Sequence, residues 1–516
     1  MRAGAIQAAL WLLATVACVA GLDQLARWQL ARQLRVEAVA NLGALARGDT
    51  PLRWRLQSSS DLVGGRIFGD CAHEFTPAGL RLRAGSQICE LGLRLRGALD
   101  LGRFDRLQID SENPLPAFFL LLRERLDQPQ RHAEVPAGTN IALDTLVWHQ
   151  DDGSAATPPR RAAMLRLRLA GLQQDLLLRD VVLRPAAALP VLSPDSAQWQ
   201  LLEDASAIPP QRLPLFAAAD GLRPEQLLAA RDRLREREPF AQVVYRRDTS
   251  AVAAAVGNDA RRPADAAAAG GKPAASASTT MPASPVSSVL PWLALTAIAA
   301  LLAALYWRPP QNARVAALLQ ALAAVALPLY LVASLHLSDD LDAWTLTALA
   351  LSLLYAAALA LRQPRLARAW LGTPRAWLLA ALGPALAVLL VGAAQWGSGA
   401  SLSLGLSWNQ VPLYVLWAAL QQWLICRVFA ERLRSSGLAQ PWIALAAALA
   451  FALLHTPNAT LMLATFAGGL LWSTIWLRER GLWPIALSHA LAAGLLVQGL
   501  PPPLLRSAEV SLRFFL

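Results

Sequence analysis

The sequence predicts a polytopic α-helical membrane protein that carries an exported β-sandwich domain. Of its 516 residues, 55% are hydrophobic and only 16% are charged, whereas soluble globular proteins have about 45–50% apolar and about 25% charged residues. The apolar residues concentrate after residue 288, and short alternating segments precede them. This distribution excludes an ordinary cytosolic enzyme and a disordered chain.

The net charge of +11 comes from arginine, because Lys272 is the only lysine. The arginines do not form a basic stripe with interleaved aromatic residues, which is the usual footprint of a nucleic-acid surface. We therefore expect no nucleic-acid partner.

Residues 1–21 predict an N-terminal signal anchor, because Arg2 is followed by an apolar run. No clean small-residue cleavage site follows, so an uncleaved anchor is expected rather than a removed signal peptide. The next region, residues 22–247, would then be exported, where a disulfide is permitted. Cys71 and Cys89 are the two cysteines of that region, and we expect them to pair.

The exported region reads as β-rich, followed by a short helical tail. Residues 91–96 and 165–169 alternate apolar and charged side chains, the period of a half-buried strand. Further candidate strands are residues 106–110, 118–123, 141–148 and 175–183. Several short strands separated by turns are typical of a β-sandwich, and their order resembles a jelly-roll, galactose-binding-like module over about residues 53–185.

Trp54 and Trp148 allow two interpretations of this domain. A sheet face carrying both could hold a sugar, which would make a glycan or another envelope ligand a partner. Alternatively, both aromatic side chains fill the core, as buried tryptophans commonly do.

Residues 224–238 predict a short amphipathic helix. Residues 248–287 consist mainly of Ala, Pro, Ser and Gly, a composition that cannot bury enough apolar surface to fold. They are expected to form a flexible linker.

Residues 288–500 predict eight membrane spans, followed by a C-terminal tail at residues 501–516. The spans are residues 288–307, 314–337, 343–361, 376–396, 408–429, 438–455, 459–477 and 482–500, each close to the length that crosses a bilayer. Arginines follow the first, third, fifth and seventh spans, so the positive-inside rule places those loops in the cytoplasm. Residues 22–287 would then lie on the extracytoplasmic side.

Four polar side chains inside the spans are candidate functional groups, because such residues are costly in a membrane. They are Gln421 and Gln422 in the fifth span, His455 at the end of the sixth and His489 in the eighth. The acidic residues after residue 288 lie in loops, at helix ends or in the tail. Each polar residue alone has a structural explanation, such as a hydrogen bond to a neighbouring helix. Together they predict one polar site within the bundle.

Three motifs follow one another within residues 412–500. They are residues 421–426, Phe451-Ala-Leu-Leu-His455 with Asn458 nearby, and residues 481–490 around His489. In order and spacing they resemble the motifs of the CAAX protease and bacteriocin-processing (CPBP) family of intramembrane endopeptidases, which has Glu-Glu-x-x-x-Arg where this chain has residues 421–426. The resemblance implies an eight-helix protease bundle in a bacterial inner (cytoplasmic) membrane. It assigns Gln421, Gln422, His455 and His489 to the site, supported by Phe451, Asn458, Cys426 and Arg427.

The chain departs from the family at three places. Glutamines replace both glutamates, Cys426 occupies the arginine position with Arg427 one residue later, and Ala493 replaces the final asparagine. The resemblance implies that the first glutamate activates a water molecule. A carboxamide cannot accept that proton, and loss of general-base assistance typically costs about 10²–10⁴-fold in rate.

One active scheme remains open for this sequence. The two glutamines would hold a water molecule while His455 or His489 takes its proton, and the other histidine and an amide would stabilise the oxyanion. The substrate would be a membrane-associated protein or peptide. Otherwise the chain is a catalytically impaired pseudoprotease that binds a membrane partner, while the exported domain recognises an envelope ligand.

We expect no cofactor. Zinc ligation by Cys426, His455 and His489 lacks a spacing motif, and nucleophilic catalysis by Cys426 with a histidine is an equally weak alternative.

Overall fold

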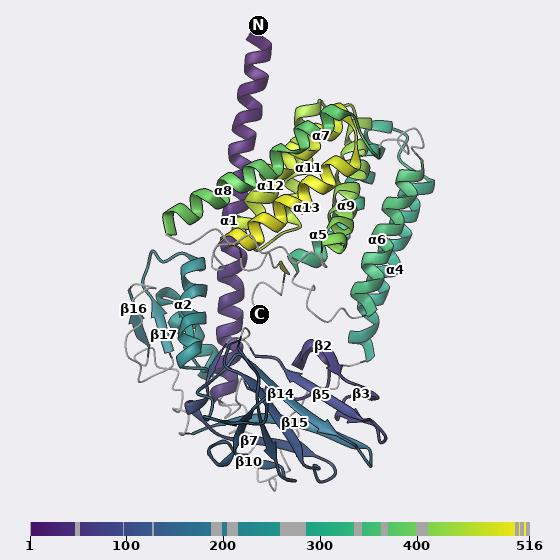
Figure 1. Ribbon diagram of the computed structural model, residues 1–516. Coiled ribbons are helices and arrows are strands. Elements are labelled where there is room, and N and C mark those ends of the chain that lie inside the picture. The colour runs from purple at the N-terminus through teal and green to yellow at the C-terminus, as the bar shows by residue number, and fades with distance from the viewer. Residues whose placement is uncertain are drawn as a thin grey trace. The chain divides into compact units, whose positions relative to one another are not determined.

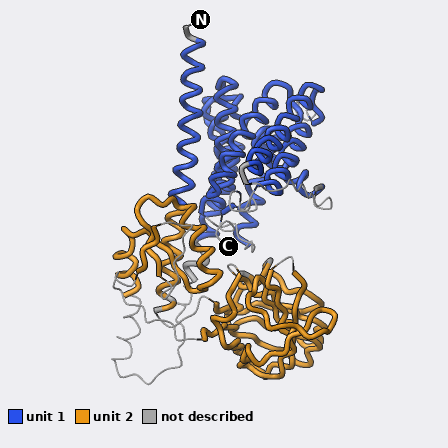
Figure 2. The backbone as a smooth tube through the Cα atoms, turned by 60° about the vertical axis from the view of Figure 1, so that its left-hand side comes forward, with its two compact units in different colours: residues 1–29, 278–516 blue, residues 30–277 orange. Residues whose placement is uncertain are grey.

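The computed structural model describes residues 2–46, 52–95, 98–125, 128–186, 199–203, 215–257, 285–334, 343–362, 370–398, 411–500, 505 and 510–511. Figure 1 shows a helical C-terminal half and an N-terminal half that contains both helices and strands. The chain divides into two compact units, residues 1–29 with 278–516 and residues 30–277 (Figure 2). Each unit is described by itself.

The first unit is a helical bundle. Its helices after the linker are α4 (Pro285–Trp307), α5 (Ala313–Ala333), α6 (Ala343–Leu361), α7 (Pro374–Ala380), α8 (Leu382–Ser398), α9 (Val411–Gln422), α10 (Glu431–Ser435), α11 (Gln440–Leu453), α12 (Ala459–Glu479) and α13 (Leu482–Gly499). Every predicted span has a helical counterpart. The fourth is divided into α7 and α8. The described part of the fifth, residues 411–429, comprises α9 and most of a π-helix, and α10 follows it.

Most of these helices can cross a membrane by length and composition. Among the described residues seven helices meet that criterion, and they include the N-terminal one; two apolar helices, residues 291–307 and α11, are shorter. The structure therefore agrees with the predicted helical membrane bundle. Because α11 has 14 residues, it extends about 21 Å, less than the roughly 30 Å hydrocarbon core.

The N-terminal helix α1 (Arg2–Ala46) runs past residue 21, where the anchor was expected to end. Residues 22–46 are therefore helical rather than the start of the β-rich region. Within the bundle unit, Leu22 and Ala26 share a buried cluster with Met462 and Phe466. The Trp11 indole donates to the carbonyl of Pro441 at 2.9 Å, so α1 packs against α11 and α12 as a member of the bundle.

The second unit contains two antiparallel sheets. One has the order β10-β7-β15-β4-β3, with β1 also paired to β15, and the other has the order β12-β11-β9-β8-β14-β5-β2. The strands are β1 (Arg53–Trp54), β2 (Leu62–Phe68), β3 (His73–Thr76), β4 (Gly79–Leu82), β5 (Ile88–Leu93), β7 (Phe104–Ser111), β8 (Phe118–Arg123), β9 (Arg131–Val135), β10 (Asn140–Ala142), β11 (Trp148–Gln150), β12 (Ala155–Ala156), β14 (Met164–Ala170) and β15 (Leu176–Pro185). A separate pair joins β6 (Leu99–Asp100) to β13 (Arg161–Ala162).

Leucines of both sheets belong to one buried core, among them Leu91, Leu120 and Leu167 of the second sheet and Leu107 and Leu178 of the first. The alternation in residues 165–169 places Leu165, Leu167 and Leu169 in that core. The disulfide Cys71–Cys89 closes a loop of 18 residues, with Cα atoms 5.0 Å apart.

One predicted strand and the sugar-face interpretation need correction. Residues 141–148 are not one strand, because β10 pairs with β7 in one sheet while β11 pairs with β9 in the other. The turn Leu143–Thr145 carries the chain between the sheets. Trp54 and Trp148 are each only 4% exposed and lie in the core, so they do not present a surface platform for a sugar.

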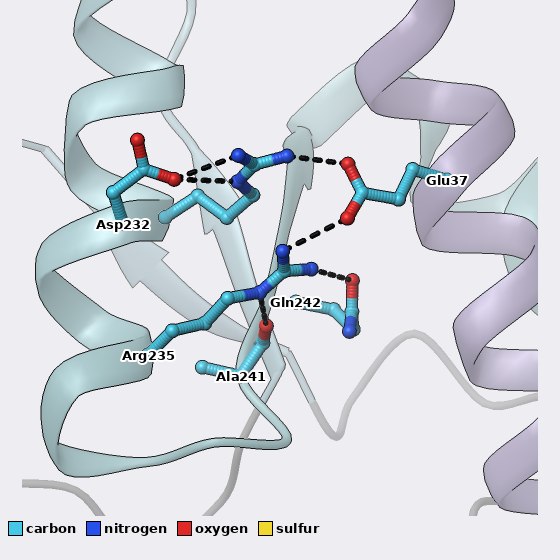
Figure 3. Close-up of polar contacts among 6 residues, drawn as sticks. Glu37, Asp232, Arg235, Ala241 and Gln242 are labelled. Atoms are coloured by element: carbon cyan, nitrogen blue, oxygen red, sulfur yellow. Dashed lines mark hydrogen bonds and ion pairs between the residues drawn. The ribbon is translucent and has the colours of Figure 1, made fainter. Parts of the chain in front are cut away.

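The second unit also contains a three-stranded parallel sheet that was not predicted. Its strands are β16 (Gln200–Leu202), β17 (Leu215–Ala218) and β18 (Gln242–Tyr245). Helix α2 (Pro224–Arg237), which was predicted, connects β17 to β18. Figure 3 shows Glu37 of α1 bound by Arg235 of α2. Arg231, also of α2, forms a second ion pair with Glu37. This buried ion cluster joins α1 to α2 within the unit.

The expected linker begins later than residue 248. Residues 249–257 are helical, and Val252 and Val256 lie in the core. Positions 258–284 of the expected linker lie outside the described residues.

Candidate active site

Three of the four predicted polar residues line one cavity of about 390 Å³ in the bundle. They are Gln421 from the end of α9, His455 from the turn after α11, and His489 from α13. The remaining lining is mainly apolar and includes Trp417, Leu386, Leu390 and Leu471. His455 lies two residues beyond the end of α11 at Leu453 and lines the same cavity as Gln421 and His489.

Gln422, the fourth predicted residue, does not line the cavity and is 1% exposed. Its amide nitrogen is 3.3 Å from His489 Nδ1, and its Oε1 accepts a hydrogen bond from the Cys426 thiol at 3.4 Å. With Oε1 committed to the thiol, the amide donates to Nδ1. His489 then carries its proton on Nε2, because a neutral imidazole has one donor and one acceptor nitrogen.

His455 has the opposite hydrogen-bond state. Its Nδ1 lies 2.7 Å from the backbone carbonyl of Phe451, and a carbonyl can only accept. The proton is therefore on Nδ1, which leaves a lone pair on Nε2. The two imidazoles thus bring one acceptor and one donor to the same site.

Aromatic contacts hold both imidazoles in place. The Phe451 ring meets His455 edge-on at 4.9 Å between centroids and His489 at 5.3 Å. Trp472 packs against His489 at 4.7 Å with an interplanar angle of 35°. Phe451, predicted as a supporting residue, therefore contacts both histidines and helps to orient them.

Trp472 and Ser488 belong to the site but were not among the predicted site residues. The Trp472 indole donates to Ser488 Oγ at 3.0 Å, and that hydroxyl donates to the Ala380 carbonyl at 2.6 Å. This chain fixes the ring that packs on His489. The available signal was a serine immediately before a histidine in an otherwise apolar helix.

Asn458 has a structural position at the start of α12. Its Oδ1 accepts from the Leu461 amide at 3.1 Å, and its Nδ2 donates to the Leu505 carbonyl at 2.8 Å. Leu505 itself lines the cavity. Asn458 therefore caps α12 and holds a residue of the tail against the site.

Arg427 and Cys426 diverge within a π-helix, Trp423–Ala430, that directly follows Gln422. Arg427 donates to the Ala360 carbonyl at the end of α6 at 3.0 Å, whereas Cys426 contacts Gln422. This π-helix thus places Cys426 at the site and Arg427 against α6. Such π-helical turns often occur at functional sites.

No carboxylate lines the cavity among the residues that the structure describes. The buried Glu431 lies elsewhere, where it accepts from the Trp476 indole at 2.9 Å and forms an ion pair with Arg480. Within the described ranges no three His, Cys, Asp or Glu side chains are grouped to hold a metal ion.

Residues 403–495 match the family model described as type II CAAX prenyl endopeptidase Rce1-like. That segment contains the glutamine pair and both histidines. No curated protein and no solved structure matches the chain. The chain therefore carries an Rce1-like domain, in agreement with the resemblance to CAAX-type intramembrane endopeptidases.

Proposed function

We propose that the chain is an active intramembrane endopeptidase that hydrolyses a membrane-associated protein or peptide. The proposal depends mainly on the opposite hydrogen-bond states of His455 and His489 at one cavity. When water attacks a carbonyl, an acceptor is needed to take the water proton and a donor is needed to stabilise the oxyanion. The two histidines provide one of each.

In the proposed mechanism, His455 is the general base and Gln421 orients the water. The Gln421 side chain faces the cavity and forms no hydrogen bond within the described residues, so its oxygen is available to the water. As the water oxygen attacks the peptide carbonyl carbon, its proton passes to His455 Nε2. The charge that forms on the carbonyl oxygen is met by His489 Nε2–H. The protonated His455 then gives its proton to the leaving amine, which yields a carboxylic acid and an amine.

Gln422 acts as a positioning residue in this mechanism. By donating to His489 Nδ1 it keeps the proton on Nε2, where the oxyanion needs a donor. The preorganised donor contributes to rate because it is fixed before charge develops. Glutamine is thus compatible with catalysis at this position, although it cannot act as a base.

The test compares the new N-termini of membrane proteins in cells that express the full chain, His455→Ala or His489→Ala. His73→Ala serves as the control, because His73 lies on the exposed strand β3 outside the bundle. We expect cleavage products in the wild type and in His73→Ala that both active-site variants lack. The same products in all four samples would contradict an enzymatic function.

A pseudoprotease remains the second candidate, favoured by the lack of a carboxylate at the cavity among the described residues. Gln421→Glu distinguishes the two functions. If the wild type produces no new termini and Gln421→Glu does, the family's chemistry has been lost here and the bundle binds its partner without cutting it.

A further inference from the structure

The C-terminal tail reaches the proposed active site at Leu505. This residue follows α13 in the chain, yet it lines the same cavity as His455 and His489. Leu505 is only 2% exposed, so almost all of its surface is in contact with the rest of the protein. A side chain of the tail therefore narrows the cavity that a substrate would have to enter.

Two hydrogen bonds attach the tail to the turn that carries His455. Asn458 Nδ2 donates to the Leu505 carbonyl at 2.8 Å, and the Ser511 amide donates to the Thr456 carbonyl at 2.9 Å. Thr456 and Ser511 are both buried. The tail is thus held at the residues one and three positions after the proposed general base.

This turn offers a fixed surface to the tail. The Thr456 hydroxyl donates to Gln29 Oε1 of α1. The Asn458 backbone amide donates to the His455 carbonyl at 3.2 Å, and the Asn458 side-chain oxygen caps α12 through the Leu461 amide. Because these contacts come from α1 and α12, we expect the turn to keep its shape when the tail leaves.

The tail can leave without dismantling the bundle. The described helices that are long enough to span a membrane end at Gly499, so displacement of Leu505 removes none of them. A neutral hydrogen bond changes such an equilibrium by only about two- to tenfold, and a buried leucine side chain by about tenfold or more. A substrate that fills the cavity can replace contacts of this size.

We propose that the tail is an autoinhibitory segment, in which Leu505 occupies the end of the cavity beside His455 and competes with the substrate. The competition rests on the proposed protease function, because it concerns access to the same two histidines. The docking of the tail does not depend on cleavage and is measured separately.

The test measures how fast a thiol in the cavity reacts. The full chain carries Gln421→Cys as a reporter, because Gln421 lines the cavity. The protein is treated in detergent micelles with a sulfonated maleimide, which reaches only thiols in contact with water. Mass spectrometry follows the label at position 421, and Cys18 of α1, which is free in the structure, serves as an internal reference.

Two further substitutions release the tail in different ways. Leu505→Ala should speed labelling at position 421 about tenfold or more, because the buried side chain no longer holds the tail. Asn458→Asp should speed it about two- to tenfold. The aspartate still accepts from the Leu461 amide as a helix cap, but it cannot donate to the Leu505 carbonyl.

Val510→Ala is the matched control, because Val510 belongs to the same tail but does not line the cavity. It should label at the rate of the reporter alone. Unchanged labelling in both release variants would overturn the proposal. Acceleration by Leu505→Ala alone would also overturn it, since that result reflects a larger cavity. A rise of the same size at Cys18 would do so as well, because it reflects a loosened bundle.

Cleavage is then measured with Gln421 restored. Leu505→Ala should raise the rate at low substrate concentration by the same factor as the labelling, because both depend on the fraction of chains whose tail has left. Faster labelling without faster cleavage, in a chain that cleaves, would overturn the competition. Absence of cleavage in every variant would count against the protease function, while the labelling would still decide whether the tail closes the cavity.

Discussion

Exchange of a carboxylate for a carboxamide reverses the direction of a hydrogen bond at His489. An ionised glutamate at position 422 could only accept, so Nδ1 would carry the proton and donate to it, which leaves a lone pair on Nε2. Gln422 donates instead, because its oxygen is occupied by Cys426. The atom of residue 422 that faces His489 Nδ1, a nitrogen in glutamine or an oxygen in glutamate, therefore decides whether His489 Nε2 is a donor or an acceptor.

Gln422→Glu should accordingly reduce cleavage about 10²–10³-fold, the usual cost of removing one oxyanion donor. The rate is measured on a substrate identified from the membrane N-termini. Gln320→Glu is the matched control, because Gln320 is also buried in the bundle but bonds to the Leu305 carbonyl. A higher rate in Gln422→Glu than in wild type would contradict the assigned donor role of His489.

Glu90 provides a pH-dependent contribution to the stability of the β-rich unit. Burial alone would raise the pKa of Glu90, but hydrogen bonds from Arg166 and Arg168 outweigh that effect and hold the pKa below its ordinary value of 4.5. A carboxyl whose pKa is lower in the folded state stabilises the fold above its unfolded pKa. That stability is lost as pH falls through the folded pKa.

Glu90→Gln should therefore destabilise the β-rich unit by about 1.5–3 kcal/mol at pH 7, the value of hydrogen bonds to a charged group. The difference from wild type should shrink progressively below pH 4.5. Thermal unfolding at several pH values measures it, with Glu74→Gln at an exposed Arg83 pair as the control. A difference that is constant with pH would contradict the argument.

Among the elements, α11 and α12 depend on close contact. A Cβ atom at Gly469 would lie 2.9 Å from the Cα of Ala448 and 3.5 Å from the Phe451 ring. Any larger side chain must separate the two helices. Since Phe451 contacts both imidazoles, that separation would also disturb the site.

Gly469→Val should lower stability by about 1–3 kcal/mol, as overpacking commonly does, and should reduce cleavage. Gly392→Val is the control, because nothing lies within 4 Å of a Cβ at Gly392 in α8. Thermal unfolding and cleavage are measured on both variants. Equal melting temperatures would show that α11 and α12 do not require the glycine.

Long elements were easier to predict from the sequence than short ones. Spans of about 20 apolar residues were evident, whereas β16 to β18 have three or four residues each, too few for a periodicity to show. The helix at residues 249–257 was missed because composition cannot reveal that Val252 and Val256 pack in a distant core. The single strand predicted at residues 141–148 failed because pairing assigns its ends to two sheets.

The site was predictable as a set of residue types but not as a hydrogen-bond network. The histidines and glutamines stood out because polar groups are rare in membrane spans. The direction of each hydrogen bond depends on Cys426 and on the Phe451 carbonyl, which only the fold brings together. The π-helix that directs Arg427 to α6 has no sequence pattern of its own.

For the whole molecule, the side of the membrane that holds the β-rich unit determines the state of its disulfide. Disulfides form in exported regions and are rare in a reducing cytoplasm. The chain has four cysteines, of which Cys18 and Cys426 are free in the structure. The redox state of the Cys71–Cys89 pair therefore reports on topology.

With the β-rich unit outside, denatured chain from intact cells should take two maleimide labels without reductant and four after reduction. The double variant Cys71→Ala, Cys89→Ala should take two labels in both cases, and its β-rich unit should lose about 3 kcal/mol of stability, as expected for an 18-residue loop. Gel shifts with a polymer-linked maleimide count the labels. Four labels on unreduced wild-type chain would place the unit in the cytoplasm, because an exported Cys71–Cys89 pair would already be oxidised.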